Sequence, residues 1–278
     1  MMQIEAGREP QSTGAGAAAV AALRVRKGRA ALDRRAVPQE AAVALVHDAS
    51  TTAVMMATPA DLEDFAIGFS LTEGVIESLD DILDLDVVER ADGWEARIWL
   101  AARRSAALTA RRRRLAGPTG CGLCGVESLA EAARAARPAP PGGEASAADV
   151  QAALSDLTAA QALGAVTRAV HAAGWWSPGE GYVCLREDVG RHNALDKLAG
   201  ALARREAARP EGLLVLTSRV SVEMVQKAAA MGAPILVAIS APTSLAVRTA
   251  EAAGVTLVAV ARDDGFEVFS HPDRIVGL

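Results

Sequence analysis

The sequence predicts a mixed α/β protein in which a small α+β part precedes a larger sheet with helices packed on its faces. From about residue 149 onward, short apolar runs alternate with segments of helical periodicity, which is typical of strands joined by crossover helices. Ahead of that part, two pairs of apolar runs flank short polar turns, as in β-hairpins. Residues 116–148 are rich in Gly and Pro, so we expect a loop and a linker between the two parts.

The first part divides into an extension and a folded unit. Residues 1–20 are small, polar and Gly-rich, and we expect them to be disordered. Residues 21–115 are predicted to form the α+β subdomain, with two hairpins whose turns carry Asp48, Ser50 and Gly93. The paired runs are 42–46 with 52–57, and 86–90 with 94–100.

A helix is expected between the two hairpins. Thr58 can cap free N–H groups, and Pro59 suits the first helical position. Asp61 suits the positive end of the helix dipole. Apolar residues then recur on one face, and Gly74 is a natural stop.

The second part, residues 149–278, is predicted to be a largely parallel sheet covered by helices. A helix over roughly 149–172 opens it, and a short strand at 266–270 closes it. The other expected strands are 182–185, 213–217, 235–239 and 255–260, and the other expected helices are 191–206, 221–231 and 243–252.

The composition excludes several classes of protein. The 278 residues are 51% hydrophobic and carry a net charge of −5, which argues against a protein that binds polyanions by bulk attraction. Aromatic residues make up 3%, which leaves little stacking surface for nucleic acid. The chain has neither the pattern of a signal peptide nor an apolar run long enough to span a membrane. We therefore expect a cytoplasmic protein that binds neither nucleic acid nor membranes.

Two of the three cysteines, Cys121 and Cys124, lie in the Gly-rich segment Gly120–Gly125. A thiol becomes a good nucleophile when its pKa is lowered by nearby cations or by a second cysteine in a Cys-x-x-Cys arrangement. The arginines at 111–114 could supply such a field, although a solvated face is the simpler interpretation of a charge run. Glycines let the loop tip bend into another protein's pocket. The arrangement suits a thiol that carries sulfur as a persulfide, which the second thiol can release.

Two other interpretations of the cysteine pair are less consistent with the sequence. Structural zinc needs four ligands, whereas Cys184 and the four histidines are too scattered for the usual spacings. A thioredoxin-like redox pair would lie where a strand meets a helix, with few glycines around it. We therefore expect no metal at this loop.

Polar loops follow the carboxyl ends of the predicted strands, where open α/β sheets bind ligands. Guanidinium groups and hydroxyls at helix N-termini match phosphate, so these loops predict a site for an anionic ligand. The hydroxyls alone are as well explained by helix capping, Arg186 by an internal ion pair with Glu187 or Asp188, and His192 by a structural role. The candidate residues are Arg186, His192, Ser218, Arg219, Ser240 and Thr243, with Arg191 and Ser221 beside them. The carboxylates of Asp263 and Asp264 do not fit phosphate but could accept the N–H donors of guanine.

Several motifs together resemble the formate dehydrogenase accessory sulfurtransferases, the FdhD family, over nearly the whole chain from about residue 40. They are Cys121-Gly122-Leu123-Cys124-Gly125, the run from Arg186 to Lys197, Ser218–Ser221 with Glu223–Lys227, Ser240–Thr243, Leu245–Val247, Thr58-Pro59, Gly68-Phe69 and Thr72–Gly74. The run from Arg186 to Lys197 is the most specific of them.

The resemblance implies a fold, a reaction and partners. It implies a cytidine-deaminase-like α/β/α fold for the C-terminal part, and a homodimer. A cysteine desulfurase would load Cys121 as a persulfide. The sulfur would then pass to a bound substrate, the molybdenum cofactor in its bis-molybdopterin guanine dinucleotide form, for formate dehydrogenase. The loop that would contact the guanine dinucleotide is Val260, Ala261, Arg262, Asp263, Asp264 and Gly265, a variable stretch in such proteins.

Two alternative functions remain open at this point. A zinc-dependent deaminase is suggested by the fold class, but Pro118 is not adjacent to Cys121 and no His-x-Glu precedes it. A cofactor chaperone without sulfur chemistry would leave the cysteines incidental.

Overall fold

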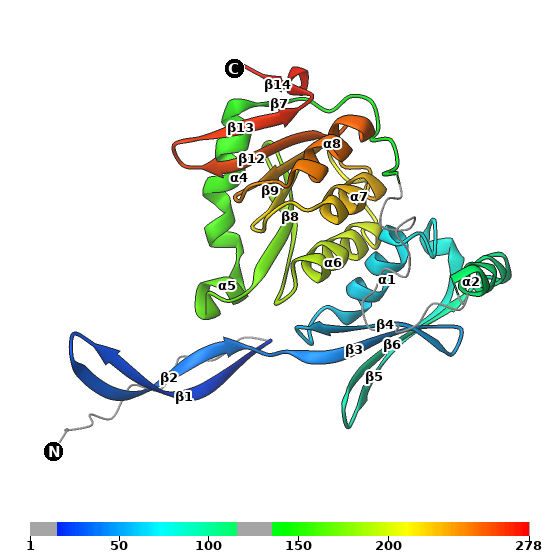
Figure 1. The fold of residues 1–278 in the computed structure, drawn as a ribbon, viewed down its shortest axis with the longest axis horizontal. Coiled ribbons are helices and arrows are strands. Elements are labelled where there is room, and N and C mark those ends of the chain that lie inside the picture. Colours follow the sequence, from blue (N-terminus) through cyan, green and yellow to red (C-terminus); the bar gives the residue numbers. More distant parts are fainter. Residues whose placement is uncertain (1–15, 116–134, 278) are drawn as a thin grey trace.

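The computed structural model describes residues 16–115 and 135–277. The described chain is mixed α/β, with a six-stranded sheet, a four-stranded sheet and a two-stranded ribbon (Figure 1). A further small pair joins β7, Ala145–Ser146, to β14, Ile275–Val276. The division of the chain into domains stays a prediction.

The two-stranded ribbon consists of β1, Ala17–Arg26, and β2, Arg29–Pro38. The strands are antiparallel, and the turn residues Lys27 and Gly28 both have positive φ, as a tight two-residue hairpin turn requires. Residues 17–20 are therefore in a strand, and the prediction that disorder extends to residue 20 was wrong for them. Pairing with residues 35–38 satisfies the backbone of this Ala-rich stretch, which its composition alone did not indicate.

The four-stranded sheet contains both predicted hairpins, in the order β4-β3-β6-β5. Asp48 and Ala49 turn the first hairpin at positive φ. Strands β3 and β6 pair in parallel. The strands are β3, Ala41–His47; β4, Ser50–Ala57; β5, Ile82–Arg90; and β6, Gly93–Leu100.

One face of this sheet is covered by α1, Leu62–Thr72. The helix starts later than expected: Asp61 is its N-cap at φ 53°, and no side chain caps it. The expected roles of Thr58 as the cap and Pro59 as the first helical residue were wrong, because Thr58 is bound to the turn after β9 instead. Gly74 has positive φ at the helix end, as expected. A 3₁₀ turn, Leu79–Asp81, precedes β5, and α2, Ala102–Leu115, follows β6.

The six-stranded sheet is mixed, in the order β13-β12-β11-β10-β8-β9. Strands β10, β11 and β12 pair in parallel, whereas β8 and β13 run in the opposite direction. The prediction of a largely parallel sheet therefore holds only for the central strands. Because β9 is antiparallel to β8, it points in the same direction as the three parallel strands. The strands are β8, His171–Ser177; β9, Gly181–Asp188; β10, Leu213–Leu216; β11, Ile235–Ala238; β12, Thr256–Arg262; and β13, Gly265–Ser270.

Helices cover both faces of this sheet (Figure 1). Helices α6, α7 and α8 pack on one face, and α4 packs on the other. They are α4, Ala147–Ala160; α5, Ala162–Thr167; α6, Arg191–Ala203; α7, Val222–Ala230; and α8, Ser244–Ala253, with a 3₁₀ turn at Pro272–Arg274. The likeness to the cytidine deaminase fold stays a prediction.

The single helix expected over 149–172 was wrong. The chain breaks at Gln161, takes a left-handed turn at Arg168 and then forms β8, in which Trp175 and Trp176 are buried. This stretch is rich in Ala, which favours helix, but pairing on both sides inside the sheet outweighs that propensity.

Helices α1 and α6 cross at two glycines. A Cβ atom at Gly68 would overlap the carbonyl oxygen of Asp196, and one at Gly200 would overlap that of Asp64. The two backbones therefore touch, which brings the N-terminal part of the chain against the six-stranded sheet. Only glycine permits this approach.

Two buried lysines lie beside this crossing. Lys197 Nζ lies 2.6 Å from Asp188 Oδ2, and both side chains are fully buried. Lys227 Nζ contacts Asp196, Thr72 and Glu73 at 2.8–3.0 Å. Burial disfavours the Lys227 ammonium, but the carboxylates of Asp196 and Glu73 outweigh it and raise the Lys227 pKa. Lys227 is therefore a charged partner of the residues at the end of α1.

Lys197→Met should destabilise the protein by about 3–5 kcal/mol, because Asp188 would keep a buried charge without its partner. Urea unfolding followed by circular dichroism measures this. The same substitution at the exposed Lys27 is the control and should change the free energy of unfolding by less than about 0.5 kcal/mol. Equal effects of the two substitutions would show that the buried pair does not matter.

Candidate functional site

The carboxyl ends of β10, β11 and β12 meet at one edge of the sheet, which we call the strand-end edge. The loops that follow these strands are bonded to one another: Val220 and Pro242 form a bridge, and the Val260 N–H donates to the Ser240 carbonyl oxygen at 3.2 Å. The predicted convergence of these loops is therefore observed. It brings together the segments that carry Ser218, Arg219, Ser240, Thr243 and Val260.

The first turn of α6 adds two nitrogen-bearing side chains to this edge. Arg191 Nε and His192 Nε2 are buried, and neither has a hydrogen-bond partner among the described residues. Burial, together with the charges of Arg191 and Lys227, lowers the pKa of His192 to about 4. His192 is therefore neutral at physiological pH. Two buried nitrogens without partners favour a ligand here, because such groups are normally satisfied.

Arg219 lies in the loop after β10 and is exposed. It makes no ion pair with any other residue in the described ranges. Its guanidinium group is thus available to a ligand at the strand-end edge.

Arg186 is used differently from what the sequence suggested. Its guanidinium group binds Asp64 of α1, with Nη2 2.7 Å from Oδ2 and Nε 2.9 Å from the same oxygen. The alternative of an ion pair with Glu187 or Asp188 was also wrong: Glu187 accepts N–H groups from α5, and Asp188 pairs with Lys197. Arg186 thus holds β9 against α1.

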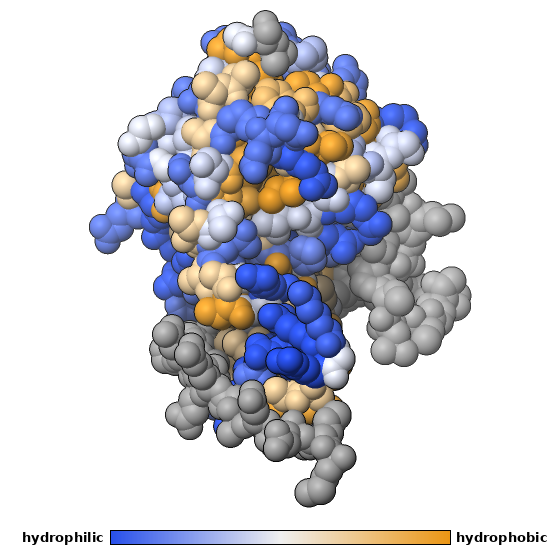
Figure 2. Space-filling view, turned by 90° about the vertical axis from the view of Figure 1, so that its left-hand side faces the viewer, coloured by the Kyte–Doolittle hydropathy of each residue, from blue (hydrophilic) through white to orange (hydrophobic). Residues whose placement is uncertain are grey.

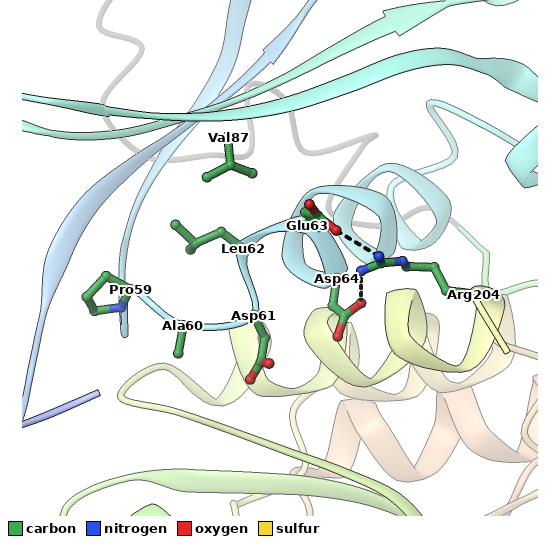
Figure 3. Close-up of a pocket in the computed structure, with 8 residues that line it drawn as sticks. All are labelled: Pro59, Ala60, Asp61, Leu62, Glu63, Asp64, Val87 and Arg204. Carbon is green, nitrogen blue, oxygen red and sulfur yellow. Dashed lines mark hydrogen bonds and ion pairs between the residues drawn. The ribbon is translucent and has the colours of Figure 1, made fainter. Parts of the chain in front are cut away.

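A cavity of about 400 Å³ lies beside this ion pair, at the start of α1 (Figure 3). Arg204 spans two carboxylates there, at 2.7 Å from Glu63 and 2.8 Å from Asp64. Asp61 adds a third carboxylate to the lining. This acidic lining does not suit a phosphate, and the cavity is separate from the strand-end edge.

The hydroxyl groups at the strand-end edge have structural roles as well. Thr243 Oγ1 accepts the N–H of Ala246 at 3.2 Å, so it caps α8, as the simpler interpretation proposed. Ser218 is buried and its hydroxyl donates to the Arg219 carbonyl oxygen. Ser240 contributes its carbonyl oxygen to Val260. None of the three is thereby shown to bind a ligand.

The segment Val260–Gly265 is a β-hairpin rather than an open loop. Strand β12 continues to Arg262, which pairs with Gly265 across the two-residue turn Asp263-Asp264. The sequence ended this strand too early because a bulge interrupts it between Ala259 and Arg262. Val260 adopts φ 52°, which is an outlier for a β-branched residue. The hairpin thus presents exposed side chains at 262–264, next to a strained residue.

Cys121 and Cys124 lie outside the described residues. The backbone of the arginine run at 111–114 belongs to α2, which ends at Leu115. Cys184 lies half-buried in β9, and burial raises the pKa of its thiol. It is therefore not an activated nucleophile.

The sequence analysis missed the residues that position the site. Thr58 donates its N–H to Asp188 at 2.9 Å, accepts the Val189 N–H, and accepts Lys197 Nζ at its carbonyl oxygen. It thereby fixes the turn that leads into α6. The available signal was Lys197 itself, one of three lysines in the chain, placed in an otherwise apolar stretch of helix.

Among the described residues, no helix has the length and apolar character needed to cross a membrane. The described part of the chain also contains no group of three or more His, Cys, Asp or Glu side chains that could hold a metal ion.

Comparison with known proteins gives concordant matches. Residues 38–276 match the model of the FdhD/NarQ family. A relative from Brucella abortus biovar 1, named "Sulfur carrier protein FdhD", is 56% identical over 87% of this chain and 90% of its own length. One with the same name from Agrobacterium fabrum is 50% identical over 92% of this chain and 95% of its own.

A solved structure agrees with these relatives. The crystal structure of a "putative formate dehydrogenase accessory protein" from Desulfotalea psychrophila has a TM-score of 0.72 at 25% identity, and covers 94% of this chain and 99% of that one. Since the family model spans most of the chain, and relatives above 45% identity cover most of it, the chain belongs to the FdhD/NarQ family.

Proposed function

We propose that this protein is a sulfur carrier that serves formate dehydrogenase. The observation that carries the proposal is the high identity, along nearly the full length, to relatives named sulfur carriers. The similar solved structure, named as a formate dehydrogenase accessory protein, supports the same client. The Cys121–Cys124 pair supplies the thiols that such a role needs.

Cys121 accepts the sulfur. Its thiolate attacks the outer sulfur of a persulfide on a cysteine desulfurase, which leaves as a thiolate, and Cys121 becomes the persulfide. Cys124 can then attack the inner sulfur of that persulfide, which releases hydrosulfide and leaves a Cys121–Cys124 disulfide. A dithiol reductant returns the pair to thiols. Cys184 does not take part, because its thiol is half-buried and has a raised pKa.

The acceptor is a molybdenum cofactor in its bis-molybdopterin guanine dinucleotide form, bound as a substrate. The strand-end edge is the proposed place for its guanine dinucleotide. Arg219 and the buried nitrogens of Arg191 and His192 offer hydrogen bonds to phosphate oxygens. The exposed carboxylates at 263–264 can accept the N–H groups of guanine.

The protein works in the cytoplasm as a homodimer. It meets the desulfurase and formate dehydrogenase in turn, so the cysteine segment must reach two different partners. A pure cofactor chaperone and a zinc-dependent deaminase are the competing functions. A chaperone would still support active formate dehydrogenase after Cys121→Ala, whereas a deaminase would purify with stoichiometric zinc.

Cys121→Ala should abolish sulfur loading and leave formate dehydrogenase inactive in a strain that depends on this protein. Intact mass after incubation with a desulfurase and cysteine should show a reducible gain of one sulfur atom in the wild type. Peptide mapping should place it on residues 119–125. Cys184→Ala is the matched control and should load normally. Sulfur loading of the Cys121→Ala protein, or active formate dehydrogenase with it, would contradict the proposal.

Arg219→Ala should weaken GDP binding by about 1–3 kcal/mol, because a charge-assisted hydrogen bond to phosphate is lost. Titration calorimetry measures the affinity. Arg29→Ala, an exposed arginine of the β1–β2 hairpin, is the control and should bind GDP as the wild type does. If the two variants bind equally, the phosphate does not lie at Arg219.

GDP binding near pH 5 should be coupled to proton uptake. His192 is neutral in the free protein because its pKa is about 4, and a phosphate group beside it would raise that pKa. At a pH between the His192 pKa of the free protein and the higher His192 pKa of the complex, His192 is protonated only in the complex. The affinity for GDP should therefore rise as the pH falls through this window. Calorimetry in buffers of different ionisation enthalpy counts the protons. His192→Gln removes this site, and an unchanged proton count in that variant would place the phosphate elsewhere.

A further inference from the structure

The β1–β2 ribbon, Ala17–Pro38, projects from the molecule (Figure 1). Its base is held by the body, where Arg35 Nη2 donates to the Thr167 carbonyl oxygen. A two-stranded ribbon by itself is marginally stable in water. A ribbon of this length therefore favours a surface that covers it.

The ribbon is amphipathic. Residues directly opposite in an antiparallel pair share a face, and Leu23 pairs with Leu32 while Val25 pairs with Ala30. Leu23, Val25 and Leu32 are 54%, 64% and 50% exposed. The opposite face carries the ion pair between Arg24 and Asp33. Three large apolar side chains on this face are thus exposed near the ribbon tip, and Arg34 lies on the same face beside them. Figure 2, seen from the side on which the ribbon projects, shows hydrophilic side chains gathered at the lower part of the molecule with hydrophobic ones beside them.

The ribbon is also strongly basic. Residues 17–38 hold six basic side chains and one acidic, a net charge of +5 in a chain whose total is −5. The segment 77–95, which includes β5, holds eight acidic side chains and one basic, a net charge of −7. The chain therefore carries a basic ribbon, with Lys27 at its tip and Arg34 on the face of Leu32, and an acidic segment. Asp81 of that segment is buried and pairs with Arg103 and Arg104, so it adds no surface charge.

The acidic segment borders a second uncovered apolar surface. The four-stranded sheet packs one face against α1, and its outer face exposes Val54 and Met56 of β4 and Trp99 of β6. Asp84 pairs with Trp99, and Asp86 with Arg97, so these two carboxylates share that outer face. The outer face thus has the apolar side chains and the negative charge that the ribbon would complement.

We propose that the ribbon of one copy packs on the outer sheet face of a second copy, and that the exchange is reciprocal. The inference rests on the homodimer of the proposed function and adds the surface through which it forms. A strand of ten residues is about 34 Å long and a two-stranded ribbon about 10 Å wide, so one ribbon face covers roughly 340 Å².

The area favours a second copy over an unrelated partner. One ribbon contact buries roughly 700 Å² in total, which is below the size of stable interfaces, whereas two symmetric contacts bury roughly 1,400 Å², within their usual range. A twofold axis supplies the second contact without further surface.

Sedimentation velocity of the full chain tests the apolar contact. The wild type should be a dimer at micromolar concentration. Leu23→Asp should raise the dimer dissociation constant at least tenfold. Val20→Asp lies on the same strand but on the opposite face, and should leave the dimer intact. Equal dimerisation of both variants would overturn the proposal, and so would a monomeric wild type.

Charge reversal tests the exchange itself. Lys27→Glu at the ribbon tip with Arg34→Glu on the apolar face should give a monomer, and so should Asp84→Lys with Asp86→Lys, because each protein alone would place like charges in contact. A mixture of the two should form a heterodimer, since both of its contacts would again join opposite charges. Absence of that heterodimer overturns the exchange. The proposed function is tested separately, by measuring sulfur loading of Cys121 in the wild type.

Discussion

The buried pair between Lys197 and Asp188 is the interaction on which the rest of the arrangement depends. A charge without its partner in this dry interior would cost several kcal/mol, so the two groups tolerate one geometry and few others. Asp188 also accepts hydrogen bonds from Thr58, Gly190 and Asn193. The turn between β9 and α6 is thereby fixed by a residue that lies about 130 positions earlier in the chain.

A second set of contacts extends this constraint to α7. Lys227 of α7 binds Asp196 of α6 and also Thr72 and Glu73 at the end of α1. Because Gly68 lets α1 touch the backbone of α6, all three helices meet around these charges. Their packing sets where α6 and α7 begin, and therefore where Arg191, His192 and the loop with Arg219 lie. The N-terminal part of the chain thus helps to position the strand-end edge through contacts of α1 with α6 and α7.

Local patterns predicted the two hairpins, the central strands and the helices that follow them, because each of those elements depends on residues close in sequence. Strand β8 escaped prediction, since its Ala-rich sequence favours a helix until pairing on both sides decides otherwise. The ion pair of Arg186 with Asp64 was not predicted, because the two residues lie 122 positions apart in the sequence. Thr58 was taken for a helix cap for the same reason. Arg186 and Thr58 thus make contacts between the two parts of the chain, whereas β8 depends on pairing within the second part, and no local pattern reports either kind of contact.

The cationic side chains of this fold fall into two groups, those paired with a carboxylate and those that are not. Lys197, Lys227 and Arg186 each form an ion pair with a carboxylate, and these pairs stabilise the fold. Arg191 and Arg219 have no carboxylate within ion-pair distance among the described residues, and they lie at the one edge where three strands end together. The net charge of the chain is −5, so the positive charge at this edge does not follow from the overall composition. A preorganised site with unpaired guanidinium groups attracts an anion more strongly than one already neutralised, because binding then exchanges water for a fixed partner without breaking an internal pair.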